Sequence, residues 1–264
     1  MGKDKKVGIV LSGGAVRCFA HLGVLKALNE QGIYPDCISG VSAGSIVGVF
    51  YASGHKPDEI LDYFLNKKLM SFIQISFAKG LANMKKLSRR LDELLKVKTF
   101  EELDIPLIIS ATNLNDARVE YFEKGSLIDK IVASCSIPVL FRPGQIDGVN
   151  YVDGGVMNNM PVEPLVDRCD KIIGVNVNPI GHREDFEDLS TIAERTFHLV
   201  VMANFINKKN KFDLFIEPDK LEEFGMFNLK QGKKIFDTGY DYTVKYLKEN
   251  KSKINFGKEK ENSK

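Results

Sequence analysis

The chain repeats one local pattern: a run of apolar residues, then a glycine-containing turn, then apolar positions with helical spacing. Residues 7–11 (VGIVL) are the first such run, a Ser-Gly-Gly turn follows them, and apolar residues recur with helical spacing over 22–28. A strand that is apolar throughout is buried on both faces, and strands separated by helices pair in parallel. The pattern predicts an α/β fold with three layers, in which a mostly parallel central sheet is flanked by helices.

The same alternation continues to residue 249 without a Pro/Gly/Ser-rich linker or an internal repeat. We therefore expect a single domain over residues 7–249 and a polar, basic, disordered tail over 250–264. The expected strands are 7–11, 37–41, 105–112, 118–122, 151–153, 171–177 and 214–217, and the expected helices are 19–28, 43–52, 58–66, 87–96, 127–136, 188–206 and 228–249.

The charges are nearly balanced, with 37 Lys and Arg against 35 Asp and Glu and a net charge of +2. Both ends of the chain are basic, which leaves the body slightly acidic. A protein that binds nucleic acid through its phosphates should be more basic, so we expect no nucleic-acid partner. The lysines of the tail could make a weak contact with anionic lipid. The alternative is that the tail is simply solvated.

No targeting segment or membrane span is expected. The apolar run at 7–11 is too short for a signal peptide, and residues 37–54, the longest uncharged stretch, include four Ser and four Gly. A membrane span needs about 20 predominantly apolar residues. The four cysteines form no CxxC pair, so free thiols are expected. The expected location is the cytoplasm, with peripheral contact at a membrane as an option.

The segment Gly40-Val41-Ser42-Ala43-Gly44 lies between an expected strand and an expected helix. A GxSxG sequence in that place is typical of a nucleophile elbow, in which a tight turn exposes the serine hydroxyl. The flanking glycines let neighbouring backbone approach closely, and the helix N-terminus favours negative charge. The alternative is a helix that begins with Ser42 as an ordinary N-cap.

A second glycine-rich turn follows the first strand, at Ser12-Gly13-Gly14-Ala15-Val16-Arg17. Successive backbone N–H groups in such a turn can converge on an anion, either a phosphate or the oxyanion of an acyl-transfer intermediate. The segment lacks the Lys and Ser/Thr of a P-loop, and it does not match the dinucleotide pattern GxGxxG.

A third candidate is Asp153, which ends an expected strand and is followed by Gly154 and Gly155. An aspartate there can point into a site at the carboxyl edge of the sheet, or it can simply stabilise the turn. A serine nucleophile needs a base, and none of the four histidines has a local signature. A Ser–Asp dyad is therefore one option for the catalytic pair.

In combination and in order, these three segments resemble the patatin-like phospholipases, lipid acyl hydrolases that use a Ser–Asp dyad. Residues 20–25 (AHLGVL) and 134–138 (SCSIP) also resemble segments of that family, and the resemblance covers roughly residues 7–180. It implies a single patatin-like acyl hydrolase domain, a lipid or acyl-ester substrate, an acyl-enzyme intermediate, no metal and no cofactor.

The resemblance also implies roles at matching positions. Ser42 would be the nucleophile and Asp153 the base, and Arg17 would brace its loop. Backbone N–H groups of the first glycine-rich loop would hold the oxyanion, and further glycines would shape the turns. The loop residues are Gly13, Gly14 and Ala15, and the turn glycines are Gly40, Gly44, Gly154 and Gly155.

Two positions depart from the family pattern, which commonly has glycine at both. Ala15 carries a Cβ that makes positive φ costly, so we expect it to adopt a negative φ. Cys18 is expected to be a buried, inert thiol.

Two other functions remain open. An acyltransferase on acyl-CoA or acyl-carrier substrates would use a histidine base, with His182 and His198 as candidates, whereas a thioesterase on such substrates would fit the same Ser–Asp dyad. A lipid-binding module without catalysis is the non-enzyme alternative. Residues 69–82 are candidates for an apolar cap or membrane-facing surface, or for ordinary core packing. The sequence indicates no oligomeric state.

Overall fold

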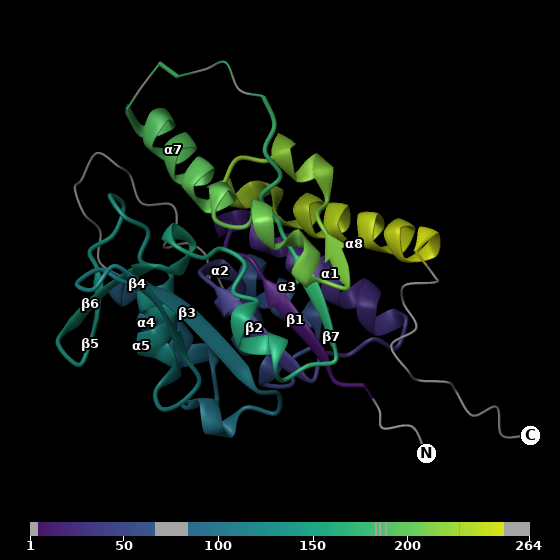
Figure 1. Ribbon diagram of the computed structural model, residues 1–264, viewed down its shortest axis with the longest axis horizontal. Coiled ribbons are helices and arrows are strands. Elements are labelled where there is room, and N and C mark those ends of the chain that lie inside the picture. Colours follow the sequence, from purple (N-terminus) through teal and green to yellow (C-terminus); the bar gives the residue numbers. More distant parts are fainter. Residues whose placement is uncertain are drawn as a thin grey trace, which may run out of the picture.

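The computed structural model describes residues 5–66, 84–182, 184, 186, 187, 189–226 and 228–250. Its centre is one eight-stranded sheet, visible in the middle of Figure 1 with helices packed around it. The strands are β1 (Val7–Leu11), β2 (Cys37–Val41), β3 (Leu107–Asn113), β4 (Arg118–Phe122), β5 (Gly144–Ile146), β6 (Val149–Asp153), β7 (Lys171–Val175) and β8 (Leu214–Ile216).

The strand order is β5-β6-β3-β2-β1-β7-β8, with β4 paired to β3 outside this path. The pairs from β3 through β2 and β1 to β7 and β8 are parallel, whereas β4, β5 and β6 pair antiparallel. Four residues connect β3 to β4 and two connect β5 to β6. Connections this short can only reverse the strand direction. The predicted α/β fold with a mostly parallel sheet is confirmed.

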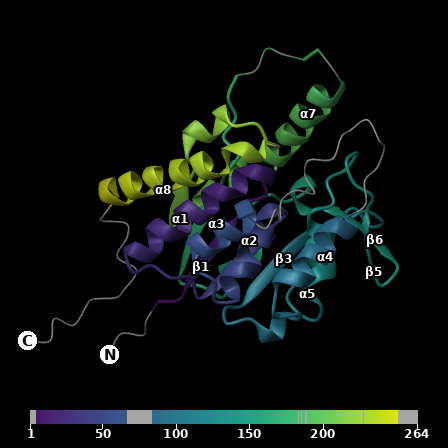
Figure 2. The ribbon, with the colours of Figure 1, turned by 180° about the vertical axis from the view of Figure 1, so that it is seen from behind.

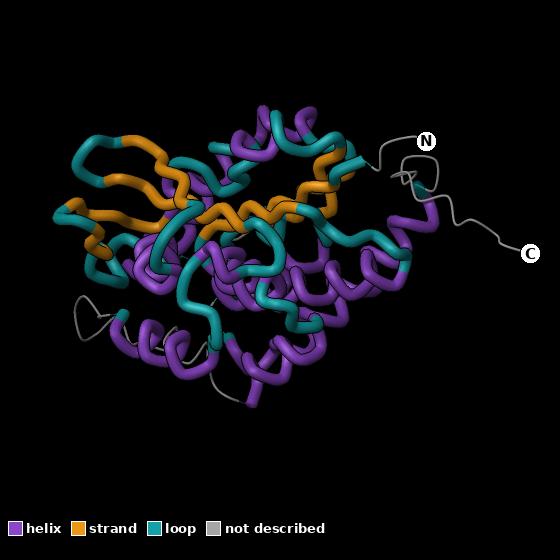
Figure 3. The backbone as a smooth tube through the Cα atoms, turned by 90° about the horizontal axis from the view of Figure 1, so that it is seen from below, coloured by secondary structure: helices purple, strands orange, loops and turns teal. Residues whose placement is uncertain are grey.

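Helices cover both faces of the sheet, so the body has three layers (Figure 3). Within β1, Ile9 and Leu11 belong to the core on one face and Val10 to the core on the other. The helices that contribute to the first core are α1 (Phe19–Glu30), α2 (Ala43–Ala52), α3 (Pro57–Asn66), α4 (Lys85–Leu94), α5 (Leu127–Ser134) and α8 (Gly232–Glu249). The short α6 (Glu163–Val166) contributes to the second core, and α7 (Leu189–Ala203) follows β7.

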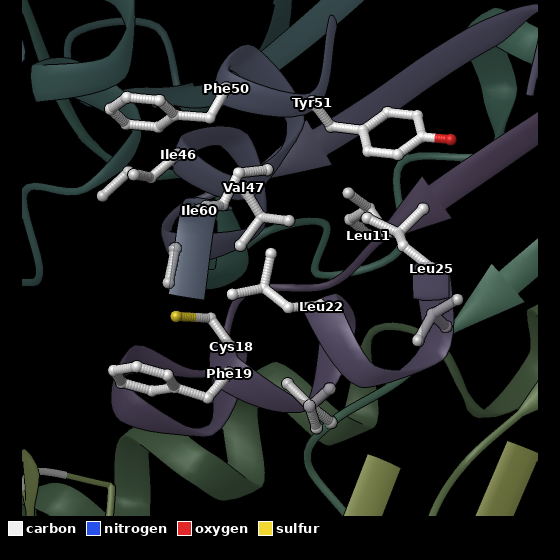
Figure 4. Close-up of a cluster of buried hydrophobic side chains, with 14 of the residues drawn as sticks. Leu11, Cys18, Phe19, Leu22, Leu25, Ile46, Val47, Phe50, Tyr51 and Ile60 are labelled. Carbon is white, nitrogen blue, oxygen red and sulfur yellow. The ribbon is translucent and has the colours of Figure 1, made fainter. Parts of the chain in front are cut away.

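The first core contains many large apolar side chains that are fully buried (Figure 4). Phe19 from α1 and Phe50 from α2 are both completely inaccessible to solvent. Burying such a side chain contributes about 1.5–3 kcal/mol. Cys18 lies in the same core, and burial raises the pKa of its thiol well above the ordinary value. The expectation of a buried thiol at Cys18 is thus confirmed, and all four cysteines are free.

Helices α1 and α8 run side by side in both Figure 1 and Figure 2, although they come from opposite ends of the chain. They touch through backbone at two glycines. A Cβ at Gly23 would collide with the backbone of Phe236 and Tyr240, and a Cβ at Gly239 would collide with the backbone of Ala20. The two helices can therefore pack this closely only because both positions lack a side chain.

The expected helices and strands are all present, with ends that shift by a few residues. The short strand β5, however, was not expected, because three residues carry too little periodicity to predict a strand. The candidate cap at 69–82 and nearly all of the tail lie outside the described residues. Within the described residues, no helix has both the length and the apolar character needed to cross a bilayer.

A substitution at the helix crossing tests its importance. Gly239→Ala should lower the free energy of unfolding by about 2 kcal/mol, because the added methyl group meets rigid backbone. Urea unfolding followed by circular dichroism measures the change. Gly225→Ala is the matched control, since a Cβ there meets nothing within 4 Å. Equal stability of the two variants would contradict the account of the crossing.

Candidate active site

Ser42 occupies the turn between β2 and α2, in a backbone conformation that few residues with a side chain adopt. Its φ is 52° and its ψ is −129°. A Cβ at Gly40 would lie 3.0 Å from the Cα of Ser45, and a Cβ at Gly44 would overlap the carbonyl oxygens of Leu11 and Ser12. The turn is therefore the strained strand-to-helix elbow that the GxSxG spacing predicts, and its glycines are required sterically.

Hydrogen bonds hold the backbone of Ser42 on both sides. Its N–H donates to the hydroxyl oxygen of Ser134 at 2.8 Å, and that hydroxyl donates in turn to the Ser110 carbonyl at 2.7 Å. On the other side, the Ser45 hydroxyl donates to the Ser42 carbonyl at 2.6 Å. These bonds compensate for the unfavourable φ by fixing the peptide groups around it.

Asp153 ends β6 and is buried, with 2% of its surface exposed. Its N–H donates to the Ser136 carbonyl at 2.9 Å, and its Oδ1 accepts the Gly155 N–H at 2.8 Å. Its Oδ2 is buried and accepts no hydrogen bond from the described residues. Because Ser134 holds Ser42 and Ser136 holds Asp153, three consecutive residues set the spacing of the two predicted catalytic groups.

Burial raises the pKa of the Asp153 carboxyl from 3.8 to about 6. The Ser42 hydroxyl and the Gly155 N–H oppose this shift, since both favour the ionised form. The Ser42 hydroxyl therefore lies beside the carboxylate, although not in a hydrogen bond to Oδ2. At neutral pH the group is ionised, and it is a stronger base than an exposed aspartate.

The glycine-rich loop after β1 lies directly against Ser42. A Cβ at Gly13 would be 3.0 Å from the Cβ of Ser42 and 2.7 Å from Oδ1 of Asn159. The N–H of Gly13 already donates to that Oδ1 at 3.0 Å. No hydrogen bond of the described residues occupies the N–H groups of Gly14 and Ala15.

The expectation of a negative φ at Ala15 is wrong, because its φ is 47°. This left-handed conformation costs an alanine about 1–2 kcal/mol. The surrounding structure imposes it: the Val16 N–H donates to the Met226 carbonyl at 3.0 Å, and the Arg17 N–H donates to the Gly14 carbonyl at 2.9 Å. The loop thus keeps a tight turn even with a methyl group at this position.

Arg17 is buried and points away from the loop. Its Nε donates to the Phe224 carbonyl at 2.8 Å, and one Nη contacts the Glu222 carbonyl at 3.5 Å. Burial lowers the pKa of its guanidinium to about 10, so it stays charged at neutral pH. These contacts tie the loop to residues 222–224, which is the bracing arrangement expected for Arg17.

The four histidines differ from one another in their contacts. The His21 ring contacts the Ser12 carbonyl through Nε2 at 2.8 Å, and burial lowers the pKa of this ring to about 4. His55 contacts the Phe50 carbonyl, and the exposed His182 contacts Glu184. His198 is buried on α7 and lines a polar cavity together with Arg17. In the described part of the chain, no cluster of His, Cys, Asp and Glu could hold a metal ion.

An apolar groove of about 360 Å³ lies among the segments that continue from these site residues. Residues 137–140 follow Ser136, Val156 follows Gly155, and Met226 is the residue whose carbonyl holds the glycine-rich loop. The fourth side is α7, which contributes Phe197 and Val200 among others. The groove is large enough for a hydrocarbon chain, and it offers such a chain an apolar surface.

Sequence reasoning missed Ser134, Asn159 and Asn178, whose side chains form hydrogen bonds with Ser42 or with the glycine-rich loop. Ser134 lies in the resembling segment 134–138, but its hydroxyl had no assigned role. Asn178 follows β7 at the carboxyl edge of the sheet, a place where polar side chains reach a site in α/β folds. This rule on polar side chains at the carboxyl edge could have identified Asn178 once β7 was known to lie beside β1.

Residues 9–166 match the family model described as patatin-like phospholipase. The chain belongs to the patatin-like phospholipase family. The predicted family is thus confirmed, and the match includes the elbow, the glycine-rich loop and Asp153 of this patatin-like chain.

Two curated relatives, one bacterial and one fungal, are longer than this patatin-like chain. It is 30% identical over 178 residues to an uncharacterized NTE family protein of Mycobacterium bovis, covering 66% of this chain and 49% of that protein. It is 25% identical over 287 residues to the lysophospholipase nte1 of Aspergillus fumigatus, covering 94% of this chain and 18% of that protein. The chain therefore spans about half the length of the mycobacterial relative.

The fold is similar to that of a solved protein, VipD from Legionella pneumophila. The TM-score is 0.56 at 18% sequence identity, and the likeness covers 94% of this chain and 67% of that one. At this identity the comparison concerns the fold alone.

The link from Ser134 to Ser42 predicts a stability effect. Ser134→Ala leaves the buried Ser42 N–H without its hydrogen-bond acceptor and removes the hydroxyl that donates to the Ser110 carbonyl, which should lower the free energy of unfolding by about 2 kcal/mol. Ser53→Ala is the control, because the Ser53 hydroxyl only donates to its own helix, and it should cost less than about 0.5 kcal/mol. Urea unfolding compares the two variants, and equal losses would contradict the proposed link.

Proposed function

We propose that this protein is a serine lipid acyl hydrolase that cleaves carboxylic esters of phospholipids or related lipids through a Ser42–Asp153 dyad. The observation that carries the proposal is the pairing of a serine on a strained elbow with a buried carboxylate beside its hydroxyl. Asp153 keeps one oxygen bound to Gly155 and the other without a partner among the described residues. That second oxygen is the natural acceptor for the Ser42 proton.

The reaction follows from these positions. Asp153 takes the hydroxyl proton of Ser42 while Oγ attacks the ester carbonyl carbon, whose oxygen becomes an oxyanion. Collapse of this intermediate breaks the bond to the alcohol, which leaves with the proton from Asp153. Water then gives a proton to Asp153 and attacks the acyl-Ser42 ester. Release of the fatty acid returns the proton to Ser42.

The loop after β1 supports a role in binding the oxyanion. The N–H groups of Gly14 and Ala15 make no described hydrogen bond, and they belong to the loop that lies against Ser42. Gly13 is also a predicted donor, but to serve it would have to release Asn159. We therefore assign the oxyanion contacts to Gly14 and Ala15.

The apolar groove supports a lipid as the substrate class. An acyl chain in the groove would pass between residues 137–140 and α7 and leave its ester near the dyad. Val139 is 70% exposed beside this groove, and Leu189 on α7 is 85% exposed. Val139 also lines the apolar groove, and an exposed apolar side chain at such a groove would favour entry of a lipid from a membrane surface. We infer a protein that works at a membrane surface on the cytoplasmic side.

Removal of either dyad residue should abolish hydrolysis. A fluorophosphonate probe should label Ser42 in the wild type, and Ser42→Ala and Asp153→Asn should each reduce kcat for a soluble nitrophenyl ester by at least about 10³-fold. Mass spectrometry of the labelled peptide identifies the nucleophile. His198→Ala is the comparison variant. An acyltransferase with a histidine base would lose its activity in this variant, whereas the dyad predicts that the variant retains most activity.

The same variants separate catalysis from folding. Asp153→Asn removes a carboxylate whose burial raises its pKa, so this variant should be more stable than the wild type at pH 7.5 while being inactive. Full ester hydrolysis by Ser42→Ala would overturn the proposed function.

The raised pKa of Asp153 also predicts the pH profile. The base must be ionised, so kcat/KM for the soluble ester should fall below a pH of about 6 and be about tenfold lower at pH 5 than at pH 8. A stopped assay over pH 4.5–9 measures it. An unchanged rate down to pH 4.5 would mean that a group with an ordinary carboxyl pKa, and not a buried Asp153, sets the profile.

A further inference from the structure

Three buried side chains hold two consecutive peptide groups of the loop after β1, and none of them was assigned a role above. We propose that Asn178 is a positioning residue that fixes the direction of the Gly14 N–H, and that His21 and Asn159 fix the peptide before it. This proposal rests on the proposed function, in which the Gly14 N–H contacts the oxyanion.

The first peptide group joins Ser12 to Gly13 and is held at both ends. Its carbonyl oxygen lies 2.8 Å from Nε2 of His21, and its N–H donates to Oδ1 of Asn159 at 3.0 Å. A carbonyl oxygen can only accept, so Nε2 of His21 carries the proton in this contact. His21 and Asn159 are 0% and 1% exposed, so neither has room to move away.

The second peptide group joins Gly13 to Gly14 and is held from one side only. Its carbonyl oxygen accepts a hydrogen bond from Nδ2 of Asn178 at 2.6 Å. A trans peptide is planar, so its N–H points opposite to its carbonyl. The hydrogen bond from Asn178 therefore determines that the Gly14 N–H points to the other side of the loop, where no described group accepts it.

Asn178 is itself held in place. It lies just beyond β7, is 1% exposed, and its N–H donates to Oδ1 of Asn176 at 3.2 Å. One residue earlier, the Val177 N–H donates to the hydroxyl of Ser12 at 3.1 Å. A Cβ at Gly14 would collide with the Val177 side chain, so the loop lies directly on the segment after β7.

Such a clamp has a chemical purpose in a Gly-Gly segment. Two adjacent glycines have the freest backbone of any pair, and an oxyanion contact stabilises a transition state only when its donor already points at the developing charge. Asn159 and Ser42 both lie against Gly13, so the clamped peptides adjoin the nucleophile. Oδ1 of Asn178 and Nδ2 of Asn159 are buried without described partners, a cost that is consistent with selection for function.

The test compares Asn178→Ala with Asn113→Ala. Both residues are asparagines with 1% of their surface exposed, but the Asn113 amide binds Asp116 and Glu120 and does not touch the loop. Active sites are counted with the fluorophosphonate, and kcat and KM are measured per active site with the soluble ester. A trifluoromethyl ketone, which forms a tetrahedral adduct with a serine, probes the oxyanion contact.

For Asn178→Ala we expect kcat to fall by about 10- to 100-fold per active site, KM to change less than about twofold, and affinity for the ketone to fall by the same factor as kcat/KM. Asn113→Ala should keep kcat and ketone affinity within about twofold of the wild type. A purely structural role for Asn178 would instead reduce the number of active sites and leave kcat per site unchanged. That result would overturn the proposal.

A second variant tests the same proposal if Asn178→Ala does not fold. Asn178→Asp has nearly the same shape but replaces the donor with an oxygen that repels the Gly13 carbonyl, so it should show the same loss. Wild-type kcat in Asn178→Asp would overturn the positioning role while leaving the proposed function intact. If the wild type itself neither reacts with the probe at Ser42 nor hydrolyses the ester, the proposed function is wrong and the proposal falls with it.

Discussion

The approach of helix α2 to the end of strand β1 is the contact on which the site depends. Gly44 presses against the carbonyl oxygens of Leu11 and Ser12, closer than any side chain would allow. Because β1 and β2 are neighbouring parallel strands with Leu11 opposite Gly40, their following turns leave the sheet at the same level. The elbow and the glycine-rich loop therefore lie in direct contact, and a methyl group at position 44 would separate them.

The third part of the site arrives from the opposite direction. Strand β6 pairs antiparallel with β3, with Asp153 opposite Ala111, so its last residue reaches the edge where β1 and β2 end. The surroundings of Asp153 together disfavour its carboxylate by about 3 kcal/mol, for a net pKa shift from 3.8 to about 6 of which burial is the largest cause. The folded state bears this cost fully above a pH of about 6 and not below about 4, where the group is protonated in both states. The raised pKa at this position thus makes the carboxylate a stronger base and, at the same time, makes the folded protein less stable.

The sequence was sufficient for the order of the elements and for Ser42 and Asp153 as candidates, because strand–turn–helix patterns and short motifs are local. It was insufficient where distant segments decide the conformation. The positive φ of Ala15 depends on a hydrogen bond from Val16 to Met226, and local sterics alone predict the opposite sign. Asn178 matters only because β7 lies beside β1, a pairing that no short motif encodes. Strand β5 exists through its pairing with β6 more than through any pattern of its own.

The clamp and the brace around the loop have a consequence for the order in which the protein is made. Ser42 and Asp153 are both synthesised by residue 153, but Asn178, Phe224 and Met226 shape the loop from far downstream. A growing chain on the ribosome would therefore contain the proposed nucleophile and base well before it could order the peptide groups assigned to the oxyanion. In the proposed mechanism, hydrolytic competence would thus be acquired late in synthesis, when nearly all of the body has been made.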